Sequence, residues 1–597
     1  MSDLDIRIRG ARIVDGTGRP AYSGDVGIRE GRIAAVRSDG RASSSASMSS
    51  AGSSMDFARE TVDADGLVLA PGFVDPHTHY DAQLCWDPSA SPSNLHGVTS
   101  IIGGNCGFSI APLGNEQDAD YIRRMLAVVE GMPLEALEQG LDWKWRSFDD
   151  FLGRLEGRTA VNAGFLVGHC ALRRTVMGER AVADKASDDE IARMGLLLRQ
   201  SLAAGGLGLS SSRSFTHRDG EGNPVPSRAA SEEELLALCD VTGQVEGTTL
   251  EFITDGCLQG FSDAEIELMT RMSLRAGRPL NWNVFTIEAK EKQRFARQIL
   301  ASQSAAERGA RVVALTMPTQ VGLTMSFLTY CALHQMPGWG KVMGLPVAER
   351  IAALRTPEVQ QALLEGTRSP DAGVFASLGR FGRYRIGETY SEANRGLTGR
   401  MLRDIAVERG QSEFDTILEI VLADDLRTVL WPQAADADVE GWSLRATVWG
   451  SEHTLLGGSD AGAHLDRMCG APYTTDFLAD CLRGRKLWSL ERAVAALSDE
   501  PARLFGLKQR GRIETGFHAD LVLFDPATVG SGEIHARNDL PGGTTRLFAE
   551  STGMKRVFVN GKAIVVDGAA TAALPGRVLR SGRDTDTVAI PAASRRG

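Results

Sequence analysis

The chain has 597 residues, of which 43% are hydrophobic and 24% are charged, as in ordinary globular proteins. Its formal net charge of −11 argues against a general nucleic-acid binder, because binding to phosphate needs a basic surface. No apolar run is long enough to span a membrane, the acidic start lacks the features of a signal peptide, and the eight cysteines show no tight repeated spacing. We therefore expect a cytoplasmic protein whose partners include neither nucleic acid nor membrane, and a homo-oligomer stays open.

The N-terminal residues predict short strands. Apolar residues alternate with polar or glycine residues between residues 4 and 36, which indicates a small antiparallel sheet. Residues 38–54 consist mainly of serine, glycine and alanine. Such a segment buries little apolar surface, so we expect a mobile loop there.

The pattern changes at about residue 70, where short apolar runs begin to alternate with helical periodicity. This alternation continues to about residue 470, and its clearest helical stretches are 188–204, 231–245, 262–276 and 291–308. Repeated strand–helix units imply a parallel sheet. Six or more units in sequence favour an α/β fold of the (β/α)8 or TIM-barrel type, although an open doubly wound sheet is not excluded. In a barrel, the chemistry lies at the C-terminal ends of the strands.

One long and less regular stretch, residues 320–440, interrupts this alternation and is largely helical in pattern. It is either an insertion that covers the mouth of the barrel or additional scaffold without contact with substrate. We interpret it as a covering insertion, with additional scaffold as the alternative.

Strand patterns return after the last helical stretch. Residues 511–525 predict a hairpin-like run, and Asn560-Gly561 predicts a hairpin turn. These strands could complete the N-terminal sheet. The end of the chain is rich in Arg, Ser, Asp and Ala, so we expect it to be poorly ordered. The expected domains are a small β domain from residues 1–69 and 509–575, a catalytic barrel at 70–508, and a tail at 576–597.

The segment from Pro71 to His79 holds the motif around which the chain is organised, Pro-Gly-Phe-Val-Asp-Pro-His-Thr-His. Side chains alternate between the two faces of a strand, so His77 and His79 should project together from a strand end. Two imidazoles side by side on a rigid strand suit a divalent metal. A chance pair of histidines in a loop is the alternative.

Three segments resemble the amidohydrolase superfamily, namely residues 71–79, the Gly-Ser-Asp sequence that ends at Asp460, and residues 511–525. The Gly-Asn-Cys-Gly turn around Cys106 and the segment from Gly168 to Arg173 are similar to its N-acyl-D-amino-acid deacylase branch, the D-aminoacylase-like proteins. The resemblance covers most of the chain. It implies a metal-bearing (β/α)8 barrel with a small β-sandwich built from both chain ends.

The resemblance also implies a set of metal ligands. The branch places its histidine pair, the cysteine of the turn and a late aspartate at the metal, and these match His77, His79, Cys106 and Asp460. It normally adds two histidines on the following strands. Here Glu251 falls at the first of these places, and residues 281–285, at the second, contain no histidine. The chain therefore departs from the Cys–His–His zinc site of the branch.

These residue types are all good ligands of Zn²⁺, the metal that we expect. The metal would activate water for attack on an amide carbonyl, and Asp460 would take the proton from water and return it to the leaving nitrogen. Asp460 could instead be a turn or capping residue, and Cys106 a small buried one. Glu251 could be a replacement ligand, a bridge to a second metal or a salt-bridged core residue. Since the two histidines are missing, we expect one metal ion per chain rather than two.

Four further residues are candidates for binding substrate. His169 follows an apolar strand and could bind substrate or metal, or hold a loop. His217 and His464 are candidate donors in the pocket. Arg213 suits bidentate binding of a substrate carboxylate, with a surface or loop-pinning role as the alternative.

The combined pattern predicts a metal-dependent hydrolase of a carbon–nitrogen bond other than a peptide bond. The favoured substrate is an N-acyl amino acid or a similar small amide, and a bulkier or aromatic amide stays open because the two histidines are missing. A cyclic amide or imide hydrolase on the same scaffold is one alternative. A catalytically degraded, metal-binding subunit is the other.

Overall fold

The computed structural model describes residues 4–38, 57–289, 291–329, 331–434 and 436–590. Apart from Ser38, the predicted loop at 38–54 lies outside the described residues. The chain divides into two compact units. Unit 1 comprises Met1–Thr319, Glu440–Leu465 and Gly470–Gly597, and unit 2 comprises Gln320–Val439 and Asp466–Cys469.

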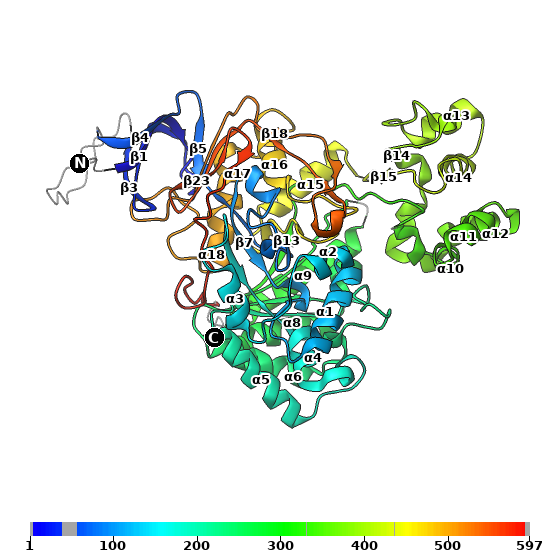
Figure 1. The fold of residues 1–597 in the computed structure, drawn as a ribbon, viewed down its shortest axis with the longest axis horizontal. Coiled ribbons are helices and arrows are strands. Elements are labelled where there is room, and N and C mark those ends of the chain that lie inside the picture. The colour runs from blue at the N-terminus through cyan, green and yellow to red at the C-terminus, as the bar shows by residue number, and fades with distance from the viewer. Residues whose placement is uncertain (1–3, 39–56, 290, 330, 435, 591–597) are drawn as a thin grey trace. The chain divides into compact units, whose positions relative to one another are not determined.

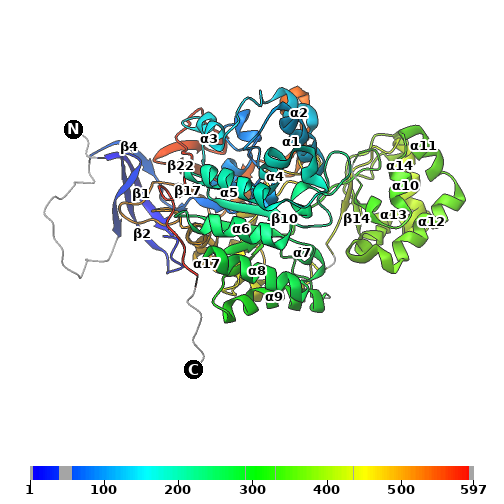
Figure 2. The ribbon, with the colours of Figure 1, turned by 90° about the horizontal axis from the view of Figure 1, so that it is seen from below.

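Strands from both ends of the chain form one nine-stranded sheet in unit 1 (Figures 1 and 2). Its strands are β1 (Leu4–Ile13), β2 (Tyr22–Arg29), β3 (Arg32–Ser38), β4 (Ala58–Asp63), β5 (Val68–Pro71), β17 (Leu521–Phe524), β22 (Met554–Val559), β23 (Lys562–Val566) and β24 (Ala569–Ala570). The antiparallel pairing of β1, β2 and β3 confirms the predicted N-terminal sheet. β17 lies between β5 and β22, so the C-terminal strands complete this sheet as predicted.

Two predictions for the C-terminal strands have different outcomes. Asn560 and Gly561 form the turn between β22 and β23, as their sequence predicts. The prediction of a hairpin-like run at 511–525 is wrong, because β17 is the one strand in it. The backbone before β17 bonds to loops instead, as when the N–H of Ile513 donates to the carbonyl of Asp15.

The chain end that was expected to be poorly ordered packs onto unit 1 as far as residue 590. Val578 and Leu579 are fully buried, and the N–H of Leu579 donates to the carbonyl of Ala163 at 2.8 Å. Burial of this apolar pair anchors an otherwise polar segment, so the composition of the tail was a poor guide. Residues 591–597 lie outside the described residues.

The other strands that position the site form two parallel sheets. The three-stranded sheet has the order β6 (Phe73–Asp75), β7 (Val98–Gly103) and β8 (Asn162–Phe165). The six-stranded sheet has the order β16 (Thr454–Leu456), β13 (Val312–Thr316), β12 (Leu280–Trp282), β11 (Thr249–Ile253), β10 (Gly208–Ser212) and β9 (Val167–Gly168). A single residue, Leu166, separates β8 from β9 in the chain. The segments that follow β6 and β16 also meet, since the N–H of His79 donates to the carbonyl of Ala461 at 2.8 Å.

Helices alternate with these parallel strands. They are α4 (His169–Met177), α5 (Asp188–Ala203), α6 (Glu232–Gly243), α8 (Asp263–Ala276) and α9 (Lys292–Glu307). Successive members of this series pack against one another (Figure 2). The last four confirm the four predicted helical stretches to within two residues at each end. Ser187 and Ser262 begin α5 and α8 with capping boxes, which satisfy backbone N–H groups that have no partner within the helix.

Further helices of the chain are α1 (Glu116–Val129), α2 (Leu134–Gln139), α3 (Phe148–Leu155), α7 (Gly256–Gln259), α15 (Val439–Trp449), α16 (Tyr473–Leu482), α17 (Leu490–Leu497) and α18 (Asp499–Leu504). Within the described ranges, no helix is both long enough and apolar enough to cross a membrane.

Unit 2 is largely helical, as its sequence predicts, and has a core of its own. Its helices and strands are α10 (Trp339–Met343), α11 (Val347–Leu354), α12 (Pro357–Arg368), β14 (Tyr384–Ile386), α13 (Leu402–Arg409), α14 (Glu413–Ala423) and β15 (Leu430–Pro432). Trp339 is fully buried at the centre of this core, where its ring packs near those of Phe327, Phe381 and Phe414. The covering role considered for this part of the chain stays a prediction.

Candidate metal centre and active site

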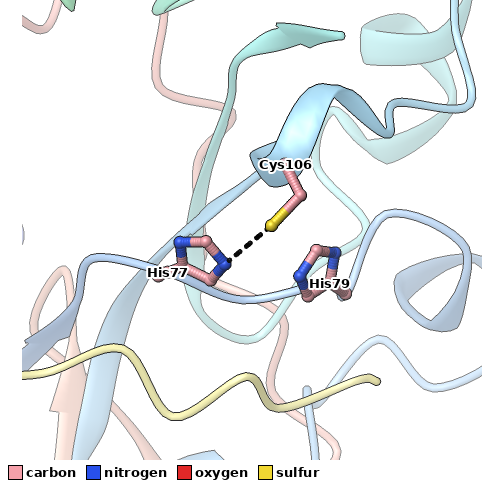
Figure 3. A group of neighbouring side chains, drawn as sticks. All are labelled: His77, His79 and Cys106. Carbon is pink, nitrogen blue, oxygen red and sulfur yellow. Dashed lines mark hydrogen bonds between the residues drawn. The ribbon is translucent and has the colours of Figure 1, made fainter. Parts of the chain in front are cut away.

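The histidine pair lies in the segment that follows β6, beyond the strand itself. Thr78, between the two histidines, points to the other side, because both its N–H and its hydroxyl donate to the carbonyl of Ile102. The imidazoles of His77 and His79 therefore share one side, with ring centroids 5.3 Å apart, and both are buried (Figure 3). The common direction that their spacing predicts is confirmed.

Cys106 comes from the turn η3 (Asn105–Gly107), which follows β7. Its Sγ points toward the histidine pair and lies 3.5 Å from Nε2 of His77 (Figure 3). The φ angle of Cys106 is +56°, in the left-handed region that is costly for a residue with a Cβ atom. The surrounding structure must therefore hold this turn in place.

Asp460 follows β16 and also has a positive φ angle, of +58°. Its Oδ1 lies 3.1 Å from Nε2 of His79 and 3.6 Å from Nε2 of His77, and its Oδ2 lies 3.5 Å from Nε2 of His464. The Asp460 side chain keeps 24% of its surface exposed, whereas the two imidazoles keep 2% or less. Asp460 is thus more accessible from the cavity than the two imidazoles.

Glu130 lies beside the cluster formed by His77, His79, Cys106 and Asp460, although no motif in the sequence marks it. It follows α1, its side chain is buried, and its Oε1 lies 3.5 Å from Nδ1 of His79. Its carbonyl oxygen accepts the N–H of His464. The position of this carboxylate depends on how α1 packs against residues more than 300 positions along the chain, which local sequence patterns do not report.

Glu251 lies fully buried in β11. Its Oε2 accepts the backbone N–H of Cys106 at 2.9 Å, and its Oε1 finds no hydrogen-bond partner among the described residues. Burial raises the pKa of this carboxyl well above its ordinary value. A nearby cation would be needed to favour its ionised form.

The charges of the cluster depend on one another. Burial, with the neighbouring His79, lowers the pKa of His77 to about 3, so this imidazole is neutral at pH 7. Burial also opposes the charged form of His79, but Glu130 and Asp460 outweigh it and raise the pKa of His79 to about 10. Burial, with Glu251, raises the pKa of the Cys106 thiol well above its ordinary value. A bound metal would lower the pKa of the Cys106 thiol and of His79, because metal ligands must be deprotonated.

The cluster fits a divalent metal. The ligand atoms of His77, His79 and Cys106 lie within 4.8 Å of one another, and so do those of His79, Glu130 and Asp460. Nδ1 of His77 is buried without a hydrogen bond to a described residue, and the two ring nitrogens of His79 face carboxylates of Glu130 and Asp460 without good hydrogen-bond geometry. Buried polar atoms without a partner are costly, and a bound cation would remove that cost. Imidazole, thiolate and carboxylate together suit a divalent transition metal.

The cluster lines a cavity of about 220 Å³. His217 and His464, two of the predicted substrate-binding residues, lie in this lining. The Oγ of Ser212 lies 2.7 Å from Nδ1 of His217, which leaves the Nε2 of that ring for another partner. The remaining lining residues are His79, Cys106, Val129, Glu130, Ser214, Thr216, Ile253, Cys257, Leu258, Asn283, Val284 and Asp460.

The other two predicted substrate-binding residues are not brought to this cavity by the described part of the chain. The guanidinium of Arg213 donates to the carbonyl of Ala230 at 2.6 Å. His169 is fully buried, with Nδ1 2.9 Å from Oγ of Ser211 and Nε2 2.8 Å from the carboxylate of Glu234. A role in substrate binding stays a prediction for both.

Side chains of metal-ligating types that gather beside a cavity, after the ends of parallel strands, are typical of a metalloenzyme. The chain belongs to the amidohydrolase family, whose sequence model matches residues 60–565. It is a hydrolase of carbon–nitrogen bonds other than peptide bonds, which confirms the resemblance and the enzyme class predicted from the sequence.

Several relatives match this chain over nearly its whole length. The D-aminoacylase of Alcaligenes xylosoxydans xylosoxydans is 28% identical over 96% of this chain and 97% of its own. The N-acyl-D-aspartate deacylase of the same organism is 29% identical over 97% of this chain and 96% of its own. Among solved structures, a D-aminoacylase described as defining a novel subset of amidohydrolases has a TM-score of 0.62 at 26% identity, and the match covers 97% of this chain and all of that chain.

Proposed function

We propose that this amidohydrolase removes the acyl group from N-acyl amino acids, or from similar small amides, with the help of zinc. The observation that carries the proposal is the gathering of His77, His79, Cys106 and Asp460 beside one cavity. Near full-length similarity to a D-aminoacylase and an N-acyl-D-aspartate deacylase supports the substrate class and favours the D enantiomer.

We assign zinc to His77, His79, Cys106 and Asp460, with Glu251 as a further donor. Zinc is favoured because nitrogen, sulfur and oxygen donors all suit it, and when bound it polarises a carbonyl and lowers the pKa of water. Asp460 would take a proton from the attacking water and return it to the leaving nitrogen. Its greater accessibility supports this role. His217 and His464, in the cavity lining, would donate hydrogen bonds to the substrate.

We also propose that the parallel strands close into a (β/α)8 barrel. This closure is supported by the continuity of β8 and β9 through Leu166 and by the hydrogen bond from the N–H of His79 to Ala461. With β8 and β9 taken as one strand, the barrel would have eight strands, namely β6, β7, β8–β9, β10, β11, β12, β13 and β16. A β-sandwich from the chain ends, the domain limits given by the sequence and a cytoplasmic location belong to the same proposal.

The test is a hydrolysis screen of the full chain over N-acyl-D-amino acids, N-acyl-L-amino acids, aryl amides and cyclic imides, with metal content measured on the same sample. We expect hydrolysis of at least one N-acyl amino acid, zinc as the bound metal, and loss of activity in Asp460→Asn. Hydrolysis of cyclic imides alone would favour the cyclic amide alternative. Bound metal without hydrolysis of any compound would favour a subunit that has lost catalysis.

A further inference from the structure

The turn that carries Cys106 is held by two side chains from neighbouring strands. Ser210 in β10 and Glu251 in β11 are register partners, so their side chains leave the sheet on the same face. Glu251 Oε2 accepts the N–H of Cys106 at 2.9 Å, and Ser210 Oγ accepts the N–H of Gly107 at 3.0 Å. Two successive amides of the turn are therefore fixed from one side.

The Ser210 hydroxyl also bridges the two ends of this turn. While its oxygen accepts from Gly107, its proton is donated to the carbonyl of Gly104. Ser210 and both its partners are buried, so water has no access to replace these bonds. Gly104, Cys106 and Gly107 all have positive φ angles, of +71°, +56° and +80°. A turn with this backbone needs outside support at Cys106, since the two glycines adopt such angles freely and a cysteine does not.

We infer that Ser210 and Glu251 are positioning residues that aim the Cys106 thiolate at the metal. The inference rests on the proposed metal-dependent function. If the two amides were released, Cys106 would relax toward negative φ, and its Sγ would leave the position 3.5 Å from Nε2 of His77. In Glu251, Oε2 holds the turn, and Oε1 is the oxygen that is left to face a metal.

Cobalt(II) is the probe for this inference, because a thiolate bound to cobalt gives a sulfur-to-metal charge-transfer absorption in the near ultraviolet. The full chain is freed of metal with a chelator and titrated with cobalt. We expect Ser210→Ala to bind cobalt about 10- to 100-fold more weakly than the wild type, the usual cost of removing a group that orients a ligand, and to show a weaker band at saturation. Ser211→Ala is the matched control. Ser211 is the next residue, is equally buried, and directs its hydroxyl to His169 instead of the turn, so its variant should keep the wild-type band.

Two further comparisons separate positioning from general loss of structure. In a Cys106→Ala background, Ser210→Ala should cause no additional loss of cobalt affinity, because its effect passes through the thiolate. Glu251→Gln keeps an oxygen that accepts the Cys106 N–H, so it should keep the thiolate band even if cobalt affinity falls through loss of the carboxylate donor. Glu251→Ala should lose affinity and also show a weaker band. If Ser210→Ala does not fold, the inference is tested with Glu251→Gln and Glu251→Ala alone. Charge-transfer bands of equal strength in these two variants would overturn it.

An unchanged band and affinity in Ser210→Ala would likewise overturn it, as would an equal loss in Ser211→Ala. A wild-type protein that hydrolyses amides but shows no band would exclude Cys106 as a ligand, and so end the inference while the proposed function stands. A wild-type protein with the band but without hydrolysis would end the proposed function and leave the positioning of Cys106 to be decided by the variants.

Discussion

Replacing Glu234 with glutamine should destabilise unit 1 by about 3 kcal/mol at pH 7. Glu234 is fully buried in α6, where its carboxylate contacts both Arg173 and His169. Arg173 is also fully buried, and its other hydrogen bonds go to the carbonyl oxygens of Ala181 and Asp184. The amide in Glu234→Gln fills the same volume but leaves the guanidinium without a counter-charge.

The magnitude follows from the pKa of this carboxyl. Burial opposes ionisation, but His169 and Arg173 outweigh it and lower the pKa of Glu234 from its ordinary 4.5 to about 2. A difference of about 2.5, at about 1.4 kcal/mol for each pKa unit, corresponds to about 3 to 4 kcal/mol, and we take the lower end for an exchange that keeps the volume. Because the pKa of Glu234 is lower in the folded chain than in the unfolded chain, its ionised form stabilises the fold. Its contribution is complete above pH 4.5 and is lost as the pH falls from about 4.5 to about 2.

Urea unfolding of the full chain at pH 7, followed by tryptophan fluorescence, measures this loss. Glu233→Gln is the matched control, since Glu233 is the exposed neighbour on the same helix and its replacement should change stability by less than about 0.5 kcal/mol. A loss below about 1 kcal/mol in Glu234→Gln would refute the reasoning from buried charge. The KM of Glu234→Gln, measured where the variant is still folded, tests the role of His169. An unchanged KM would support a structural role for His169. A raised KM without loss of stability would support its predicted role in substrate binding.

Three further predictions concern the metal and the chemistry. His77→Ala with His79→Ala should abolish tightly bound metal while the chain stays folded, and elemental analysis beside circular dichroism checks this, with the exposed His535→Ala as control. Occupancy should be close to one metal per chain, because the two histidines that the resemblance implies are missing. Two tightly held ions would contradict this and draw attention to Glu130. Asp460→Asn should lower kcat by about 10²- to 10⁴-fold at saturating zinc, and a loss below tenfold would exclude Asp460 as the general acid and base.

The parts of the site that could be predicted from the sequence are those encoded by short-range spacing. His77 and His79 share one direction because they flank Thr78, which bonds to Ile102 on the other side. The helices α5 and α8 begin at serines that the sequence shows plainly. Cys106 and Asp460 were identified through motifs, and the structure brings both to the histidine pair.

The other parts depend on contacts between distant segments. Glu130 has no local signal, because the packing of α1 alone brings it to His79. Ser210 stands in a run of three serines, and only the three-dimensional structure distinguishes the one whose hydroxyl meets the Cys106 turn. The guanidinium of Arg213 suits a carboxylate, but its direction is fixed by a carbonyl group 17 residues later, that of Ala230.

The nine-stranded sheet has a consequence for synthesis on the ribosome. β5 emerges from the ribosome long before its neighbour β17, which begins 450 residues after β5 ends, at Leu521. During that interval β5 has an unpaired edge, the kind of edge that recruits other chains. The N-terminal strands must therefore stay shielded or loosely folded until residues 521–524 have been made. Chains that stop before residue 521 should aggregate through this edge even though every residue of the proposed metal site has already been made.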